Sequence, residues 1–290
     1  MCRLFGMSGG TERLQATFWL LEAPDSLAQQ SRREPDGTGL GTFSENGRPL
    51  VFKQPLAAYE DHAFAREARE VSSRTFVAHV RYASTGEVAP RNTHPFELDG
   101  RLFAHNGVIG DLDRLEHELG DEMNRVQGDT DSERFFALIS REIERAGNVS
   151  AGITRAARWV AQTLPVFALN FVLITESELW ALRYPDVHEL HVLERAAGGT
   201  SGDRTLEHAS ARGSVRVRSA DLARAPAAVI ATEPMDEDPG WRALDSGALL
   251  HVDHELRITV TRPLERPPAR PLTLAQLGPR AAASQAPASR

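Results

Sequence analysis

Cysteine is nearly absent from this sequence, since Cys2 is the only one among 290 residues. A single cysteine excludes an intramolecular disulfide and suits a reducing compartment. Lysine is equally rare: Lys53 is the only lysine among 33 basic residues. Long hydrophobic runs are missing too. The most apolar stretch, residues 166–175, contains Asn170 and is far too short to span a bilayer.

The N-terminus lacks the basic start and apolar segment of a signal peptide, so the sequence predicts a cytoplasmic protein with no membrane partner. The net charge of −7 argues against nucleic acid as the main partner. A hydrophobic fraction of 41% with 25% charged residues is ordinary for a globular chain. A chain of this length can bury a hydrophobic core that is stable without disulfide bonds or structural metal ions.

Short runs of β-forming residues alternate with amphipathic segments, which predicts an α+β domain with two stacked sheets as the simplest arrangement. The clearest helix follows Gly128, where Thr130 and Glu133 form a capping-box pattern before residues 134–145. Further helices are expected at 14–30 with a break near Pro24, at 60–71 and at 151–164. The expected strands are 4–8, 40–43, 75–81, 101–105, 168–175, 178–183, 189–193, 227–232 and 257–261.

Two segments lack such patterns. Residues 196–213 are rich in glycine, serine and threonine, which predicts a mobile loop. From residue 263 onward proline, alanine and arginine dominate without a periodic apolar face. The sequence therefore predicts one domain over 1–262 and a mostly disordered tail over 263–290.

Polar motifs stand where strands or turns are expected to end, and their order along the chain is more informative than any one of them. They are 1–6 (MCRLFG), 35–37 (PDG), 79–86 (HVRYASTG), 92–96 (NTHPF), 104–107 (AHNG) and 128–133 (GDTDSE). With these motifs the chain resembles the class II glutamine amidotransferases, which are N-terminal nucleophile hydrolases. The resemblance covers residues 2–145, and it continues through 230–234 and Trp241 in a pattern similar to the small stand-alone, YafJ-type members.

The resemblance implies a four-layer αββα sandwich of two mostly antiparallel sheets between helical layers. It also implies that Cys2 is the nucleophile once Met1 is removed. The α-amine then freed has a pKa near ~8, close to the thiol's ~8.5, so one residue supplies nucleophile and base. The alternative for a lone cysteine is a buried residue of the first strand, but its position and the downstream motifs favour the nucleophile.

By the same resemblance, Arg81 binds the α-carboxylate of the substrate, with Ser84 and Thr85 lining the same loop. A guanidinium suits this role because its planar fork makes two parallel hydrogen bonds. Asp131 is expected to bind the substrate's α-ammonium group. The structural alternatives are a salt bridge for Arg81 and a favourable charge on the helix dipole for Asp131.

Asn106 and Gly107 are expected to form the oxyanion hole, since acyl transfer needs donors aimed at the developing negative oxygen. The Asn106 side-chain amide and the Gly107 N–H would supply them. The same dipeptide also marks hairpin turns, which is the alternative. Three histidines, His79, His94 and His105, lack the spacing of a closed metal site, so we expect neither a metal nor a cofactor.

Three functions fit these motifs. The first is a stand-alone glutamine amidotransferase or glutaminase, whose ammonia goes to a separate synthase partner or escapes. The second is an amidohydrolase for a larger γ-glutamyl compound, as in ergothioneine-type thiol metabolism. The third is a binding or regulatory protein that keeps the fold without turnover, against which the retained Cys2, Arg81 and Asn106 argue. Tyr82 differs from the tryptophan common in larger synthases, and the sequence leaves the γ-glutamyl substrate open.

Overall fold

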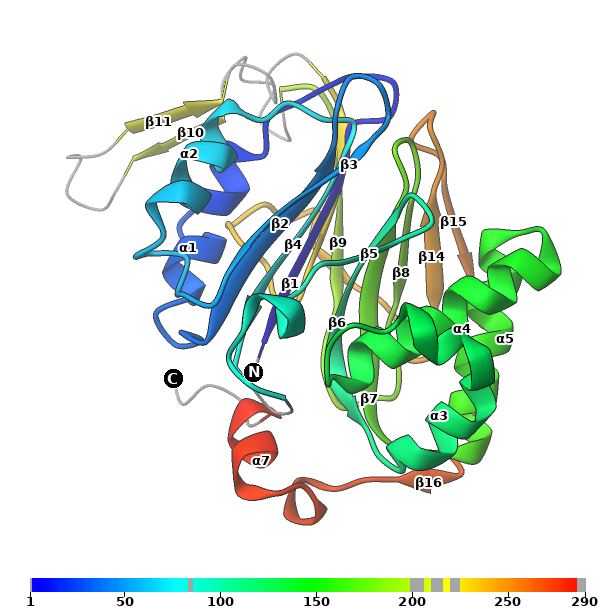
Figure 1. Cartoon of the computed structure of the whole chain (residues 1–290). Helices are drawn as coiled ribbons and strands as arrows, with labels where there is room; N and C mark the ends of the chain where they lie inside the picture. The colour runs from blue at the N-terminus through cyan, green and yellow to red at the C-terminus, as the bar shows by residue number, and fades with distance from the viewer. Residues whose placement is uncertain (1, 83–85, 199–205, 210–215, 220–224, 286–290) are drawn as a thin grey trace.

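Two β-sheets packed face to face form the centre of the protein, and helices cover the outer face of each (Figure 1). The computed structural model describes residues 2–82, 86–198, 206–209, 216–219 and 225–285. All pairings within the two sheets are antiparallel apart from that of β16 with β7. This is the predicted α+β sandwich with the layer order αββα.

The first sheet holds the N-terminal strand at its centre, in the order β13-β9-β12-β1-β4-β2-β3. Every residue of β1 is buried, so this strand is covered on both faces. The strands are β1 (Arg3–Ser8), β2 (Gly37–Phe43), β3 (Pro49–Gln54), β4 (Thr75–Arg81), β9 (His191–Arg195), β12 (Ala227–Ala231) and β13 (Arg242–Ala243).

The second sheet has the order β15-β14-β8-β7-β6-β5, and the short strand β16 pairs with β7 in parallel. A separate hairpin joins β10 (Leu206–Ala209) to β11 (Arg216–Ser219). The strands of the second sheet are β5 (Phe96–Leu98), β6 (Arg101–Ile109), β7 (Pro165–Ile174), β8 (Leu179–Leu182), β14 (Leu249–Val252), β15 (Ile258–Thr261) and β16 (Arg270–Pro271).

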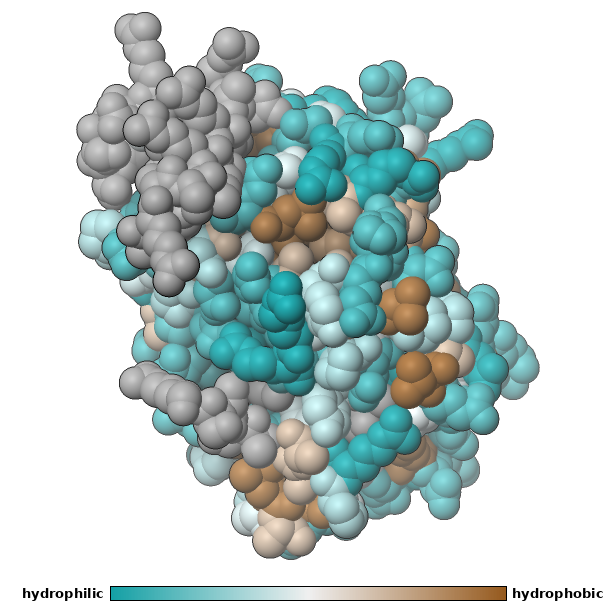
Figure 2. All heavy atoms as spheres, turned by 90° about the vertical axis from the view of Figure 1, so that its left-hand side faces the viewer, coloured by the Kyte–Doolittle hydropathy of each residue, from teal (hydrophilic) through white to brown (hydrophobic). Residues whose placement is uncertain are grey.

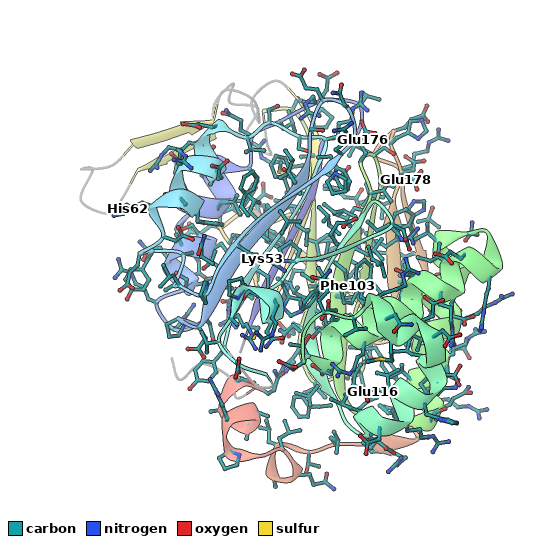
Figure 3. The ribbon with its side chains drawn as sticks, viewed as in Figure 1. Lys53, His62, Phe103, Glu116, Glu176 and Glu178 are labelled. Atoms are coloured by element: carbon teal, nitrogen blue, oxygen red, sulfur yellow. The ribbon has the colours of Figure 1, made fainter. Side chains whose placement is uncertain are left out.

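Three hydrophobic clusters hold the layers together. Helices α3 (Leu112–Leu119), α4 (Asp131–Ala146) and α5 (Val149–Thr163) cover the second sheet. There Phe103 of β6, labelled in Figure 3, stacks on Phe136 of α4 with ring centroids 4.8 Å apart. The first sheet is covered by the short π-helix η1 (Phe18–Glu22) and by helices α1 (Leu27–Gln30) and α2 (His62–Glu70). Aliphatic side chains fill the space between the sheets.

Most expected elements are present, with shifted ends. Thr130 caps α4 by accepting a hydrogen bond from the Glu133 N–H at 3.2 Å. The Glu133 carboxylate does not complete the capping box, because it accepts from the Gln127 and Gly128 N–H groups instead. In the segment expected as a loop at 196–213, the described part contains β10, while 199–205 and 210–213 lie outside the described residues.

The C-terminal segment differs from the disordered tail that its composition predicts. It forms β16, the 3-10 turn η4 (Leu274–Gln276) and helix α7 (Pro279–Gln285), and residues 286–290 lie outside the described part. Leu272 and Leu277 pack on a small cluster of Val108, Phe167 and Ala168. The sandwich thus supplies the apolar surface that the segment's own sequence lacks.

Polar side chains cover most of the described face seen in Figure 2, and hydrophobic ones gather there in small separate groups. Scattered exposed apolar residues are normal for a globular protein. Among the described residues, no helix has both the length and the hydrophobicity needed to cross a membrane.

Candidate active site

Cys2 stands directly before β1, at one end of the two-sheet sandwich. Its side chain is buried, with 7% of the residue exposed, and it is unbridged. The backbone N–H of Tyr82 donates to Sγ at 3.2 Å, and Sγ lies 3.4 Å from the carbonyl oxygen of the same residue. Burial raises the pKa of the thiol to about 11, so Cys2 is protonated near neutral pH.

The start of β1 is fixed from the neighbouring strand β12. Thr232, which follows β12, accepts a hydrogen bond from the Leu4 N–H through Oγ1 at 2.8 Å. Arg3 Nε donates to Glu233 Oε1, also at 2.8 Å. The segment at 230–234 noted in the sequence therefore holds the residues that position Cys2.

Asn106 and Gly107 lie within strand β6 and not in a turn, so the hairpin alternative for this dipeptide does not apply. Asn106 is 1% exposed, and its Nδ2 donates to the Cys2 carbonyl oxygen at 2.9 Å across the sandwich. A Cβ atom at position 107 would lie 1.9 Å from the Ala168 carbonyl oxygen. Only glycine fits there.

Arg81 is the last residue of β4, the strand that pairs with β1. It therefore lies at the same end of the sheet as Cys2, and it is 4% exposed. Its Nη1 donates to the Glu87 carbonyl oxygen at 3.0 Å. Burial lowers the pKa of the guanidinium, and nearby Cys2 and Asp36 oppose that change. An arginine this basic still carries its charge at any physiological pH. Ser84 and Thr85, expected in the same loop, lie outside the described residues.

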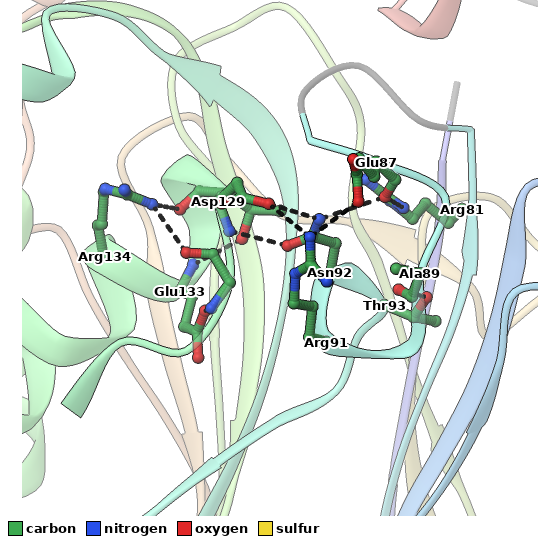
Figure 4. A network of polar contacts seen from close by, with 11 residues as sticks. Arg81, Glu87, Ala89, Arg91, Asn92, Thr93, Asp129, Glu133 and Arg134 are labelled. Carbon is green, nitrogen blue, oxygen red and sulfur yellow. Dashed lines mark hydrogen bonds and ion pairs between the residues drawn. The ribbon is translucent and has the colours of Figure 1, made fainter.

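The loop after β4 is tied to the loop before α4 by the polar network shown in Figure 4. Asn92 donates through Nδ2 to the Glu87 carbonyl oxygen at 3.3 Å and to Asp129 Oδ2 at 3.2 Å. Its Oδ1 accepts from the Asp129 N–H at 2.8 Å. This network therefore links the loop that contacts Arg81 to the residues just before Asp131.

Asp131 occupies the first turn of α4 and is 2% exposed. Its Oδ2 accepts a hydrogen bond from the Ile109 N–H at 2.8 Å, at the end of the strand that carries Asn106 and Gly107. Next to it, Ser132 Oγ lies 2.9 Å from His105 Nδ1. Asp131 thus joins the helix N-terminus to β6, a contact that sequence patterns did not indicate.

These groups surround one small cavity. The remaining space is about 20 Å³, which is enough for one water molecule. Of the predicted site residues, the structure brings Cys2, Arg81, Gly107 and Asp131 to its wall, and Asn106 contacts Cys2 directly. The other lining residues are His79, Tyr82, His94, His105, Thr130, Ser132 and Gln285.

His79 and His94 form a buried pair with ring centroids 4.3 Å apart, and none of their four ring nitrogens has a hydrogen-bond partner in the described part of the chain. Burial lowers the pKa of His79 to about 3, so its ring is uncharged near neutral pH. Gly39 lets the loop that carries His94 approach, because a Cβ there would lie 1.9 Å from the His94 carbonyl oxygen. Across residues 2–82, 86–198 and 225–285, no three His, Cys, Asp or Glu side chains form a metal-binding group.

The sequence analysis did not predict two contributions to this cavity, those of Tyr82 and Gln285. The backbone of Tyr82 contacts the thiol, a role that any residue type could fill, so no sequence signal marks it. Gln285 lines the cavity from the far end of the chain, in a segment that lacks a periodic pattern.

Comparison with known proteins gives one consistent family. The family model described as "Glutamine amidotransferases class-II" matches residues 1–271. Escherichia coli YafJ, a relative named among glutamine amidotransferases, is 28% identical over 262 residues, which are 85% of this chain and 95% of YafJ. A structure described as a predicted glutamine amidotransferase from Pseudomonas aeruginosa superposes with a TM-score of 0.60 and 23% identity, covering 90% of this chain and 100% of that one.

Other relatives are longer than this chain. DUG3 of Saccharomyces cerevisiae, named as a probable glutamine amidotransferase, is 29% identical over 169 residues, which are 51% of this chain and 47% of DUG3. An amidophosphoribosyltransferase of Methanothermobacter thermautotrophicus is 29% identical over 55% of this chain. The match spans only 33% of that enzyme.

Proposed function

The chain belongs to the class II glutamine amidotransferases, and from this premise we propose that it is a stand-alone amidohydrolase that cleaves a γ-glutamyl amide through a thioester on Cys2. One observation carries the proposal: the only thiol of the chain, a buried guanidinium and a buried carboxylate line the same cavity. A γ-glutamyl substrate carries the matching groups, namely an electrophilic amide carbon, an α-carboxylate and an α-ammonium.

The thiol needs a base, because burial keeps it protonated near neutral pH. After removal of Met1, the α-amine of Cys2 would accept the thiol proton, and sulfur would attack the γ-carbonyl carbon. The proton then passes to the leaving amine or ammonia as the C–N bond breaks. Water, deprotonated by the same amine, would cleave the thioester and release the γ-carboxylate.

Asn106 would bind the oxyanion formed in both steps. Its amide NH₂ carries two hydrogens, and the Cys2 carbonyl takes only one. We propose the Gly107 N–H as the second donor. Arg81 and Asp131 would bind the α-carboxylate and the α-ammonium, with Ser84 and Thr85 beside Arg81.

Ammonia released from glutamine would serve a separate synthase partner. This proposal takes its support from relatives whose names describe amide-nitrogen transfer, namely amidophosphoribosyltransferase and glutamine–fructose-6-phosphate aminotransferase.

A hydrolysis screen tests the proposal. The Met-processed protein is incubated with glutamine and a series of γ-glutamyl amides of increasing size, and glutamate release is measured. We expect turnover of at least one of them and none of the α-glutamyl isomers, which present the wrong carbonyl to Cys2. A folded, processed protein that hydrolyses no γ-glutamyl compound would contradict it.

Arg81→Lys should lower kcat/KM roughly 10- to 100-fold, the effect of losing one charge-assisted hydrogen bond. Lysine keeps the charge but cannot form the planar two-bond fork. Steady-state kinetics with the best substrate from the screen measures the change. Arg145→Lys is the matched control, because Arg145 is exposed on α4 and, in the part of the chain that the structure describes, its ion pair is with Glu142 alone. Equal kcat/KM for the two variants would remove Arg81 from the substrate site.

A further inference from the structure

The C-terminal segment crosses the end of the sandwich at which Cys2 lies (Figure 1). Its first part is held by backbone hydrogen bonds: the Ala269 N–H donates to the Ala161 carbonyl and the Leu272 N–H to the Val166 carbonyl, both at 2.8 Å. Its last part, α7, lies below the N-terminus in that view.

Helix α7 contributes one residue to the cavity. Ala281, Ser284 and Gln285 are its buried residues, and of these Gln285 lines the cavity. Gln285 Oε1 accepts a hydrogen bond from His188 Nε2 at 2.8 Å, and both residues are nearly inaccessible to solvent. The pair joins α7 to the loop between β8 and β9.

The cavity beside Cys2 holds about one water molecule, which is far less than a γ-glutamyl group requires. The cavity must therefore enlarge before such a substrate binds, through the removal of Met1, through movement of part of its wall, or through both. Cys2 adjoins β1 and Arg81 ends β4, and both strands pair with neighbours on two sides. Gly107 lies in β6, which pairs with β7 at this position.

Helix α7, which brings Gln285 to the wall, is 7 residues long. A groove of about 560 Å³ lies beside it, lined by residues 108–111, by the chain leading into α7 and by the first residues of α7. Short elements with few packed neighbours are the ones that open locally.

We propose that α7 is a gate over the γ-glutamyl pocket, and that the Gln285–His188 hydrogen bond is its latch. The inference rests on the function proposed above, since it assigns this cavity to the substrate. In the closed form Gln285 and the buried face of α7 exclude substrate from Cys2. Withdrawal of α7 admits it, so the latch sets the fraction of molecules able to bind.

The single cysteine gives a direct test, because alkylation by iodoacetamide can mark only Cys2. The Met-processed wild-type protein, Gln285→Ala and a chain ending at Gly278 are compared, with intact mass following the reaction. Gln285→Ala should react about fivefold faster, the effect of losing one hydrogen bond on the opening equilibrium, and the shortened chain should react faster still. Gln276→Ala is the matched control, since Gln276 is exposed and, within the described residues, its side chain accepts hydrogen bonds from Thr273 alone.

Kinetics adds a second measurement. Because closed molecules cannot bind, a larger open fraction lowers the apparent dissociation constant. With any γ-glutamyl substrate, Gln285→Ala should lower KM by the same factor and leave kcat unchanged. Wild-type labelling rates in Gln285→Ala, with a native melting curve, would overturn the gate even if the shortened chain failed to fold. A protein that hydrolyses no γ-glutamyl amide, yet shows faster labelling in Gln285→Ala, would instead overturn the proposed function and keep the gate.

Discussion

A permanent N-terminal extension should abolish turnover as completely as Cys2→Ala does, a loss of at least ~10³-fold in kcat. In the extended protein the nitrogen of Cys2 belongs to an amide, which has no basic lone pair. The thiol is buried and its pKa is raised to about 11, so at neutral pH it stays protonated without an adjacent base. An intact nucleophile without its base is therefore expected to perform little better than no nucleophile.

Initial rates on the best γ-glutamyl substrate decide the matter, with the N-terminus of each protein verified by intact mass. Melting curves should coincide, because neither change removes a packed side chain larger than a thiol. The pH dependence of Cys2 alkylation tests the protonation state of the thiol independently. Since burial raises the thiol pKa, alkylation of Cys2 in the extended protein should keep increasing as pH rises toward 11.

An extended protein that turned over at the processed rate would show that the N-terminal amine is not the base. Among the described residues, three histidines line the same cavity and could substitute for it: His79, His94 and His105. All three rings are buried and their pKa values are lowered by that burial, which makes them poor proton acceptors. The amine, with an ordinary pKa near ~8, suits the task better.

The strand and the helix start that carry site residues were predictable from sequence, because strand patterns and helix caps depend on residues close together in the chain. Phe76, Val77 and Ala78 form a continuous apolar run that stays a buried strand in any packing, and β4 covers the predicted range 75–81. The Thr130 cap likewise depends on residues only three positions apart.

Contacts between distant elements were not predictable in the same way. Asn106-Gly107 has the composition of a turn, yet β6 continues through it to Ile109, because β7 pairs with it and Asp131 accepts the Ile109 N–H. The edge strand β3 was missed for a related reason: its residues are only partly covered, so they lack the apolar pattern of a buried strand. In both strands the conformation depends on the strands paired beside them and not on their own residues alone.

The C-terminal segment shows where composition misleads. Proline and alanine give it no apolar face of its own, which predicts disorder. Leu272 and Leu277 nevertheless pack on an apolar cluster of the sandwich, and Gln285 forms a hydrogen bond with the buried His188. A few well-placed contacts can order a segment whose average hydrophobicity is low.

Asn106→Ala should lower kcat by ~10²–10³-fold with little change in KM, the usual effect of removing one oxyanion donor. The reason is that the ground-state carbonyl oxygen is weakly charged, whereas the tetrahedral intermediate carries a full negative charge there. Stabilisation that grows along the reaction changes kcat rather than KM.

The variant also removes a structural contact, since Asn106 Nδ2 donates to the Cys2 carbonyl at 2.9 Å. Two further variants separate the loss of the oxyanion donor from the loss of this structural contact. Asn106→Asp keeps the size but places an acceptor where a donor is needed, so it should lose at least as much kcat. Asn148→Ala, at the N-cap of α5, should cost about 1 kcal/mol of stability and no activity. If Asn106→Ala loses stability like Asn148→Ala yet retains kcat, the oxyanion must rest on backbone N–H groups alone, with Asn106 serving only to position Cys2.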